Sequence, residues 1–339
     1  MKTDRRSFIR KSSLIGAGTA IGPQIVFSRE KPATAKGKRI GIIGLDTSHS
    51  IAFTKTLNNP PSGMDLHDYK VVAAYPHGSR EIESSYSRIP GYTEEIKKLG
   101  VTITESIEQL LDQVDVVLLE TNDGRLHLEQ AMLVFKAGKR MFIDKPVAAS
   151  LADAIAIYDA AEKYNVPVFS SSSLRYIHGV DKISAGEIGN VLGADTYSPA
   201  SIEKTHPDLF WYGVHGVEIL FTVMGTGCKE VVRVFTENTD KVVGIWQDGR
   251  IGTFRGLRNG KRGYGGTVFG EEEIRHLGDY AGYNPLLVQI VEFFETGIPP
   301  VSREETLEIF AFMEAADQSK ANGGLPVSID AVMERALNR

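Results

Sequence analysis

The sequence has very little cysteine, no long apolar run beyond its first residues and no excess of one charge. Cys228 is the only cysteine of 339 residues, which excludes an intramolecular disulfide and a metal site with several thiolates. We expect it to be a packed thiol. No later stretch approaches the ~20 apolar residues of a membrane helix, so we expect no integral membrane segment in the mature chain. The net charge is −5 with acids and bases mixed along the chain, which predicts no basic face for nucleic acid.

The first residues resemble a twin-arginine export signal. Arg5 and Arg6 are followed by Phe8 and by a short run of apolar and small residues at 14–21. We therefore predict a signal peptide over residues 1–35, with a candidate cleavage site at 33–35, and a periplasmic or otherwise exported protein. The remainder, at about 150 residues per domain, predicts two domains.

In the first half, short β-branched runs alternate with amphipathic helical segments. Such alternation predicts a parallel sheet with crossover helices. The expected strands lie within 39–45, 70–75, 114–121, 140–146 and 166–173, and helices are expected within 106–113, 127–138 and 150–165. Ser150 is a natural N-cap for the last of these helices.

After Arg175 the sequence changes to longer polar strands and glycine-rich turns. Residues 241–270 predict antiparallel sheet with a hairpin at Asp248-Gly249. Residues 286–297 and 303–324 return to a helical pattern. The sequence therefore predicts a second domain that differs in architecture from the first.

Three separated stretches resemble the Gfo/Idh/MocA oxidoreductases, which act mainly on sugars, cyclitols and related alcohols. The stretches are "FIDKPVAASLADA" at 142–154, the longer run "ETNDGRLHLEQAMLVFKAGKRMFIDKP" at 120–146, and "FWYGVHGVEILFTVMG" at 210–225. The resemblance implies an α/β fold with a Rossmann dinucleotide-binding domain at 36–171. It also implies an α/β domain at 172–339 for substrate binding and oligomerisation, whose large, mostly antiparallel sheet often forms an interface between subunits.

The resemblance also implies roles for residues near the end of the expected strand at 140–146. Lys145 would lie between nicotinamide and substrate and would hydrogen-bond the reacting oxygen. Asp144, which stands where the family has Glu, and Thr121 and Asn122 would contact the cofactor. His127 would open the next helix, and a simple helix start explains it equally well. Taken alone, a Lys-Pro pair favours a surface lysine before a turn.

The stretch at 210–225 resembles the family's helix with a catalytic histidine. His215 matches that histidine and could take the alcohol proton, while Glu218, at i+3, could help orient the imidazole. Trp211 replaces the family's usual acid four residues before the histidine. Trp211 and Tyr212 are either a stacking platform for a sugar or core aromatics. Arg175 is a candidate substrate or interdomain contact.

The loop after the first expected strand departs from the dinucleotide fingerprint G-x-G-x-x-G. Gly44 keeps the turn glycine, but Asp46 and His49 replace the second and third glycines. One interpretation is that Asp46, Thr47 or Ser48 only begins a helix. Another is that the hydroxyls of this loop help the helix N-terminus bind an anion. A third is that Asp46 and His49 face the ligand, as acid and base or in a metal site, but two ligands are too few to predict a metal.

The loop after the second expected strand lacks the acid that binds the ribose of NAD. Ser79 and Arg80 stand there instead, as in sites that accept a 2′-phosphate. A solvated loop explains them equally well, so the cofactor is left as NAD or NADP.

These observations favour an exported NAD(P)-dependent oxidoreductase that acts on a sugar, cyclitol or related polyol by hydride transfer. The expected partners are a small sugar-like substrate and further copies of the chain through the second sheet. Two alternatives remain open. The first is a glycoside hydrolase or lyase that oxidises its sugar transiently, and the second is a non-catalytic ligand-binding protein that lost the cofactor site.

Overall fold

The computed structural model describes residues 37–338. The predicted signal peptide, with Arg5, Arg6 and the candidate cleavage site at 33–35, lies outside the described residues. Within residues 37–338, no helix is both long and apolar enough to cross a membrane.

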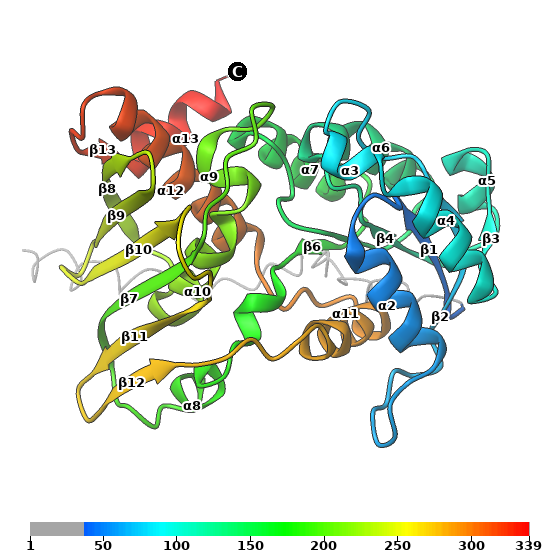
Figure 1. Cartoon of the computed structure of the whole chain (residues 1–339), viewed down its shortest axis with the longest axis horizontal. Helices are drawn as coiled ribbons and strands as arrows, with labels where there is room; N and C mark the ends of the chain where they lie inside the picture. The colour runs from blue at the N-terminus through cyan, green and yellow to red at the C-terminus, as the bar shows by residue number, and fades with distance from the viewer. Residues whose placement is uncertain (1–36, 339) are drawn as a thin grey trace, which may run out of the picture. The chain divides into compact units, whose positions relative to one another are not determined.

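The first sheet within residues 37–338 has six parallel strands in the order β3-β2-β1-β4-β5-β6 (Figure 1). Its strands are β1 (Arg39–Ile43), β2 (Lys70–Tyr75), β3 (Thr102–Ile103), β4 (Val116–Leu119), β5 (Met141–Ile143) and β6 (Val168–Ser170). This is the strand order of a Rossmann fold, in which ligands bind beyond the carboxyl ends of the strands, where the order reverses between β1 and β4. The five strands expected from the sequence are confirmed. The two-residue strand β3 was not among them.

Helices cover both faces of this sheet. Helices α2 (Ser48–Asn58), α4 (Ile89–Lys98) and α11 (Asn284–Thr296) pack on one face, and α5 (Ile107–Leu111), α6 (His127–Lys136) and α7 (Leu151–Lys163) pack on the other. The Ser150 side chain caps α7 by accepting a hydrogen bond from Asp153 N, as expected. Two short helices, α3 (Glu83–Tyr86) and η1 (Gly124–Leu126), lie in the loops after β2 and β4.

Helix α11 reaches the first sheet from late in the chain. The ring of Phe293 meets that of Phe169 in β6 at 4.8 Å, and the Arg140 guanidinium donates to the carbonyl of Phe294 at 2.6 Å. The predicted boundary between residues 171 and 172 falls between β6 and η2 (Ser173–Tyr176). Because α11 returns to the first sheet, the division into domains at that point stays a prediction.

The second sheet of the described chain has seven strands in the order β12-β11-β7-β10-β9-β8-β13. The strands are β7 (Val191–Pro199), β8 (Cys228–Thr236), β9 (Thr239–Trp246), β10 (Ile251–Leu257), β11 (Gly265–Gly270), β12 (Ile274–Leu277) and β13 (Val327–Ser328). Neighbouring strands run antiparallel, except for β7 and β10, which are parallel. The expected hairpin at Asp248-Gly249 joins β9 and β10, and Gly249 takes a φ of 89° there. The predicted mostly antiparallel sheet is confirmed.

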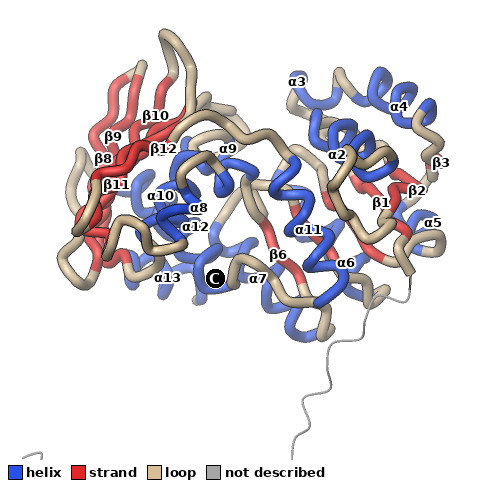
Figure 2. The backbone as a smooth tube through the Cα atoms, turned by 90° about the horizontal axis from the view of Figure 1, so that it is seen from below, coloured by secondary structure: helices blue, strands red, loops and turns tan. Residues whose placement is uncertain are grey.

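Helices α10 (Val214–Met224) and α12 (Arg303–Ala321) cover one face of the second sheet (Figure 2). A Cβ at Gly216 would lie 2.2 Å from the ring of Phe254, so only glycine lets α10 approach the sheet this closely. Cys228 is buried at the start of β8, and burial raises the pKa of its thiol to about 12, as expected for a packed thiol. The remaining helices are α8 (Val180–Ser184), α9 (Asp208–Trp211) and α13 (Ile329–Leu337).

Candidate functional site

The two predicted catalytic side chains, Lys145 and His215, come together beyond the carboxyl end of β5. Lys145 follows that strand and is 8% exposed, while His215 lies in the first turn of α10 and is 5% exposed. Burial lowers the pKa of His215 well below its usual range, and the nearby Lys145 ammonium lowers it further. The imidazole is therefore neutral at physiological pH and able to accept a proton.

Ser172 sets the orientation of the His215 ring. The Ser172 hydroxyl lies 2.7 Å from Nδ1 of His215. The expectation that Glu218 orients this histidine is wrong, because the Glu218 carboxylate instead accepts hydrogen bonds from Arg175 at 3.0 Å and from Ser171 at 2.9 Å. Arg175 and Ser171 belong to the segment around η2, which packs along α10. The Arg175 guanidinium stabilises a buried carboxylate more than a neutral imidazole does.

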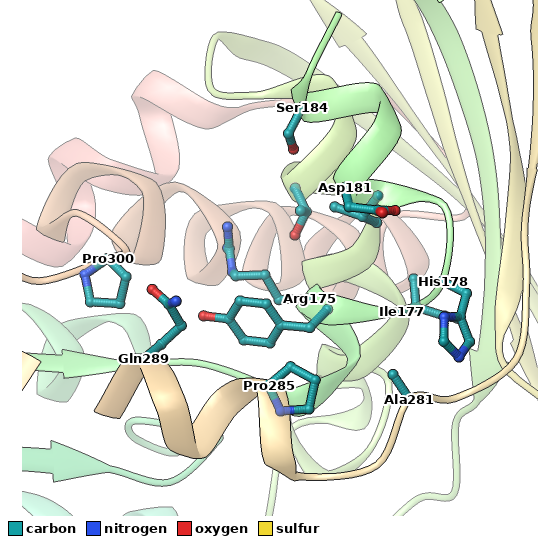
Figure 3. A pocket seen from close by; sticks show the side chains of 12 residues that line it. Arg175, Ile177, His178, Asp181, Ser184, Ala281, Pro285, Gln289 and Pro300 are labelled. Carbon is teal, nitrogen blue, oxygen red and sulfur yellow. The ribbon is translucent and has the colours of Figure 1, made fainter. Parts of the chain in front are cut away.

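Arg175 connects helices and is 9% exposed. Besides Glu218 in α10, it donates to the Glu305 carboxylate in α12 at 2.6 Å. The same residue lines a cavity of about 530 Å³, together with Asp181 and Gln289 among others (Figure 3). Both carboxylates belong to the predicted domain 172–339, as Arg175 does, so neither contact is the expected interdomain contact, and the substrate role of Arg175 stays a prediction.

A wall of tyrosines runs from His215 to His49. The first two tyrosines meet through their hydroxyls, which lie 2.9 Å apart, and the ring centroids of the other successive pairs lie 4.7 to 6.2 Å apart. The members are Tyr212, Tyr264, Tyr280 and Tyr283. Only Tyr212 was predicted, although the other three stand in glycine-rich stretches where aromatic side chains are a signal for a ligand. Trp211 takes a different partner and lies 5.0 Å from the ring of His206.

Asp46 is turned into the protein rather than toward the crevice. Its carboxylate is fully buried and accepts hydrogen bonds from the backbone N–H groups of Ser79 at 2.8 Å and Asn122 at 3.0 Å. It thereby ties the loop after β1 to the loops after β2 and β4. Helix α2 is capped by Thr47, whose hydroxyl accepts from His49 N at 3.4 Å. Of the interpretations of this loop, a helix start at Thr47 is confirmed. Asp46 instead connects three loops through the hydrogen bonds of its carboxylate.

The other predicted cofactor contacts lie around the same crevice. A Cβ on Gly44 would lie 2.5 Å from the backbone nitrogen of Thr121, so this position requires glycine. Thr121 is 1% exposed, and no described residue hydrogen-bonds its hydroxyl. Asn122 is engaged elsewhere, because its side-chain amide donates to Ser85. His127 begins α6 and bonds the Thr121 carbonyl through Nε2 at 2.6 Å, which fits its structural interpretation.

The end of β2 has a second cavity, of about 230 Å³, lined by Tyr75, His77 and Arg80 among others. Arg80 is exposed there. Ser79 is not part of this lining, because its hydroxyl donates to Asp123 at 3.0 Å inside the protein. Ser48 is the first residue of α2, and its predicted contact with the cofactor stays a prediction.

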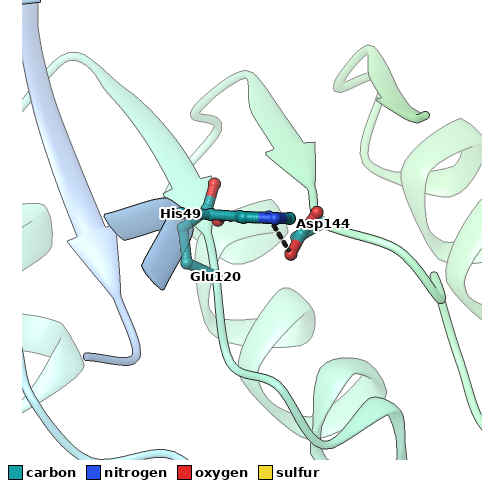
Figure 4. A group of neighbouring side chains, drawn as sticks. All are labelled: His49, Glu120 and Asp144. Carbon is teal, nitrogen blue, oxygen red and sulfur yellow. Dashed lines mark hydrogen bonds and ion pairs between the residues drawn. The ribbon is translucent and has the colours of Figure 1, made fainter. Parts of the chain in front are cut away.

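His49 meets two carboxylates at the ends of β4 and β5 (Figure 4). Its Nδ1 donates to Oδ2 of Asp144 at 2.8 Å and lies 4.0 Å from Oε2 of Glu120. Burial tends to raise the pKa of Asp144, but His49 and Lys145 outweigh it and hold that pKa at about 2. Burial and the Asp144 charge raise the pKa of Glu120 well above its usual range. Glu120 was missed from the sequence, although a lone carboxylate that ends a buried strand was a signal for it.

The crevice fits a nicotinamide dinucleotide. Gly44 keeps the tight turn, the N-terminus of α2 is available to a diphosphate, and Thr121 brings an unpartnered buried hydroxyl. The Asp46 carboxylate accepts two N–H groups inside the protein, which weakens its repulsion of a phosphate. Which residues contact the dinucleotide stays a prediction.

Comparison with known proteins gives two curated relatives over part of the chain. An uncharacterised oxidoreductase of Streptococcus pneumoniae is 30% identical over 121 residues, which are 34% of this chain and 32% of that protein. Glucose-6-phosphate 3-dehydrogenase of Bacillus subtilis is 22% identical over 206 residues, which are 54% of this chain and 53% of that protein. The matches thus span about a third and about half of the relatives' lengths.

Solved structures share the fold over most of the chain. A "probable dehydrogenase" of Thermotoga maritima has a TM-score of 0.71 at 20% identity, with 87% of this chain and 99% of that chain covered. Scyllo-inositol dehydrogenase of Lactobacillus casei, solved with NAD(H) and scyllo-inositol, has a TM-score of 0.68 at 15% identity, with 87% and 100% covered. At these identities the likeness shows the fold.

The family match falls on the first sheet and its helices. Residues 38–172 match the oxidoreductase family with an NAD-binding Rossmann fold. This segment therefore resembles the NAD-binding domain of the Gfo/Idh/MocA oxidoreductases, and the solved structures share the fold over most of the chain.

Proposed function

We propose that the protein is an NAD(P)-dependent oxidoreductase that oxidises a secondary alcohol of a sugar, cyclitol or related polyol. The observation that carries the proposal is the convergence of Lys145 and the neutral His215 beside the tyrosine wall, at the carboxyl end of a Rossmann sheet. A general base and a cationic hydrogen-bond donor are the two side chains that oxidation of an alcohol requires.

In this proposal, Lys145 donates a hydrogen bond to the alcohol oxygen and His215 removes the hydroxyl proton through Nε2. For Nε2 to accept, Nδ1 must carry the ring hydrogen and donate it to the Ser172 hydroxyl, which lies within hydrogen-bond distance. A nicotinamide dinucleotide, when bound, would accept the hydride from the same carbon.

The tyrosine wall supports a polyhydroxylated ligand. Tyrosine offers an apolar face to the C–H groups of a sugar ring and a hydroxyl to its oxygens. The substrates named for the relatives, glucose 6-phosphate and scyllo-inositol, are of this chemical class. The proposed substrate class rests on the wall and on these names together.

Nucleotide analysis tests the proposal directly. The purified protein is denatured, any released nucleotide is identified by mass spectrometry, and the folded protein is titrated with NAD(H) and NADP(H) in separate arms. We expect one nucleotide to be bound or to bind, and a panel of sugars and inositols to be oxidised with its reduction. Absence of both bound nucleotide and measurable affinity would refute the proposal and favour a non-catalytic protein. Cleavage of a glycoside without net nucleotide reduction would instead favour a hydrolase or lyase.

We also propose that the protein is exported by the twin-arginine pathway. The adjacent Arg5 and Arg6 and the short run at 14–21 support this. Residues 1–35 fused to a reporter that is active only after folded export should deliver it to the periplasm, and changing both Arg5 and Arg6 to Lys should retain it inside. Equal export of both fusions would refute the proposal.

A further proposal concerns assembly. The face of the second sheet away from α10 and α12 carries apolar side chains that are exposed in the described chain, and a second copy would remove them from water. They are Leu192, Tyr197, Val234, Ile251, Phe269 and Ile274. Light scattering should give a dimer or larger assembly, and Ile251→Lys should dissociate it. A wild-type monomer at micromolar concentration would contradict this.

A further inference from the structure

We propose that His49, Glu120 and Asp144 bind one divalent metal ion of the zinc or manganese type. Each residue offers one ligand atom, and these atoms all lie within 4.8 Å of one another. The three side chains come from the first turn of α2 and from the ends of β4 and β5 (Figure 4). The site lies beyond the oxidoreductase function proposed above and does not depend on it.

The first reason is that Glu120 is buried without partners. Its side chain is 0% exposed, and no described residue hydrogen-bonds either of its carboxylate oxygens. Oδ1 of Asp144, which is 1% exposed, lacks a partner as well. Buried carboxylate oxygens that lack hydrogen bonds are costly, because they have lost water and gained nothing in return. A cation between them supplies the missing interaction.

The second reason is the geometry. Ligand atoms at about 2.1 Å from a tetrahedral ion lie about 3.4 Å from one another. The Nδ1 atom of His49 now lies 2.8 Å from Oδ2 of Asp144 and 4.0 Å from Oε2 of Glu120. Changes of about 0.6 Å in each distance would reach that arrangement, and rotation of two side chains can supply them. An ion bound to Nδ1 requires the neutral imidazole with its ring hydrogen on Nε2.

The third reason is charge. Two buried carboxyl groups, those of Glu120 and Asp144, lie together at the ends of β4 and β5. Acidic groups that are crowded together away from water favour a cation between them. A proton shared within the cluster would be the competing way to satisfy them. That arrangement would leave the wild-type protein without a tight metal site, so a binding measurement separates the two.

The donor set indicates the kind of ion. One imidazole nitrogen with two carboxylate oxygens suits zinc or manganese, whereas magnesium prefers oxygen ligands and retains its waters. Bound there, the ion would tie the altered loop after β1 to the ends of β4 and β5. Metal would thereby hold His49, which stands where the fingerprint has its third glycine, against the ends of these two strands.

The test is metal binding by the whole protein without nucleotide or substrate. The protein is stripped with a chelator, titrated with Zn²⁺, Mn²⁺ and Mg²⁺ by calorimetry, and its metal content is measured after desalting. We expect one Zn²⁺ or Mn²⁺ per chain and weaker binding of Mg²⁺. The matched variants are Glu120→Gln, which removes a ligand charge at nearly constant shape, and Glu94→Gln, which removes an exposed carboxylate far from the cluster.

Glu120→Gln should weaken binding by a factor of about 100 or more, and Glu94→Gln should leave it unchanged. Replacement by Co²⁺ gives a second measurement on the unmutated protein, since the visible spectrum of bound Co²⁺ reports a nitrogen and oxygen ligand set. Failure of the wild type to retain stoichiometric metal would overturn the proposal, as would equal affinity in the Glu120→Gln variant. Neither result bears on nucleotide binding, so the oxidoreductase proposal is tested separately.

Discussion

Replacement of Asp46 tests whether the altered loop is held by an internal carboxylate. In the Asp46→Ala variant, the backbone N–H groups of Ser79 and Asn122 lose their acceptors, which lie at 2.8 and 3.0 Å. A hydrogen bond to a charged group contributes about 1.5 to 3 kcal/mol, and an unpaired buried N–H costs a similar amount. Burial of the carboxylate raises the pKa of Asp46, so part of this gain is already offset in the native protein. We therefore expect a net loss of about 2 to 4 kcal/mol in the free energy of unfolding.

Asp46→Asn should lose less, about 1 to 2 kcal/mol, because the amide oxygen keeps one of the two acceptors. The assay is urea unfolding followed by fluorescence and circular dichroism, with Asp112→Asn as a control. Asp112 is exposed at the end of α5, and its replacement should change stability by less than about 0.5 kcal/mol. If Asp46→Ala is no less stable than the control, the carboxylate does not hold these loops together.

The pH dependence of the same group has a defined sign. Because the pKa of Asp46 is raised in the folded state, its proton contributes stability that is fully present below the unfolded pKa. This contribution is lost as the pH rises through the folded pKa. Asp46→Asn should therefore flatten that part of the stability profile relative to the wild type.

Four further predictions concern the site itself. Ser172→Ala should lower kcat by about tenfold, because His215 loses the partner of Nδ1. Ser172→Thr, which keeps the hydroxyl, should restore the rate, and unchanged kcat in Ser172→Ala would show that Ser172 does not position His215. Since the pKa of His215 is lowered, kcat/KM should stay flat down to about pH 6.5, and an acid limb centred above that value would contradict a neutral base. Lys145→Ala should lower kcat/KM by about 100-fold or more, while cooperative unfolding by denaturant shows that the variant is folded. Unimpaired turnover would contradict the proposed mechanism. Because the pKa of Asp144 is lowered to about 2, its carboxylate contributes stability that is present above about pH 4 and lost as the pH falls toward 2. This contribution is about 2 kcal/mol. Urea unfolding at several pH values should show it in the wild type and not in Asp144→Asn.

Much of the fold could be predicted because it depends on local patterns. Short β-branched runs and amphipathic segments placed the strands and helices of the first sheet, and the Ser150 cap and the Asp248-Gly249 hairpin were recognised from single positions. Each of these features depends on neighbours within a few residues, which the sequence displays directly. The pairing of Lys145 with His215 was reached through the family resemblance, not through spacing.

Side-chain direction and long-range packing could not be predicted. His215 and Glu218 lie three residues apart on one helix, but a guanidinium and a hydroxyl from the segment around η2 satisfy the carboxylate, so the pair does not form. Helix α11 was recognised as a helix, but its place on the first sheet depends on contacts such as Phe293 with Phe169, more than 100 residues apart.

The altered loop shows the same division. The sequence by itself determined that Gly44 makes a turn, that the second and third glycines are missing, and that a helix begins near Thr47, because backbone conformation and capping are local. Only the tertiary structure decided that Asp46 turns inward to bind two other loops and that His49 meets Glu120 and Asp144. The burial and charge of a side chain depend on the strands that surround it, and those strands are brought together only by the folded sheet.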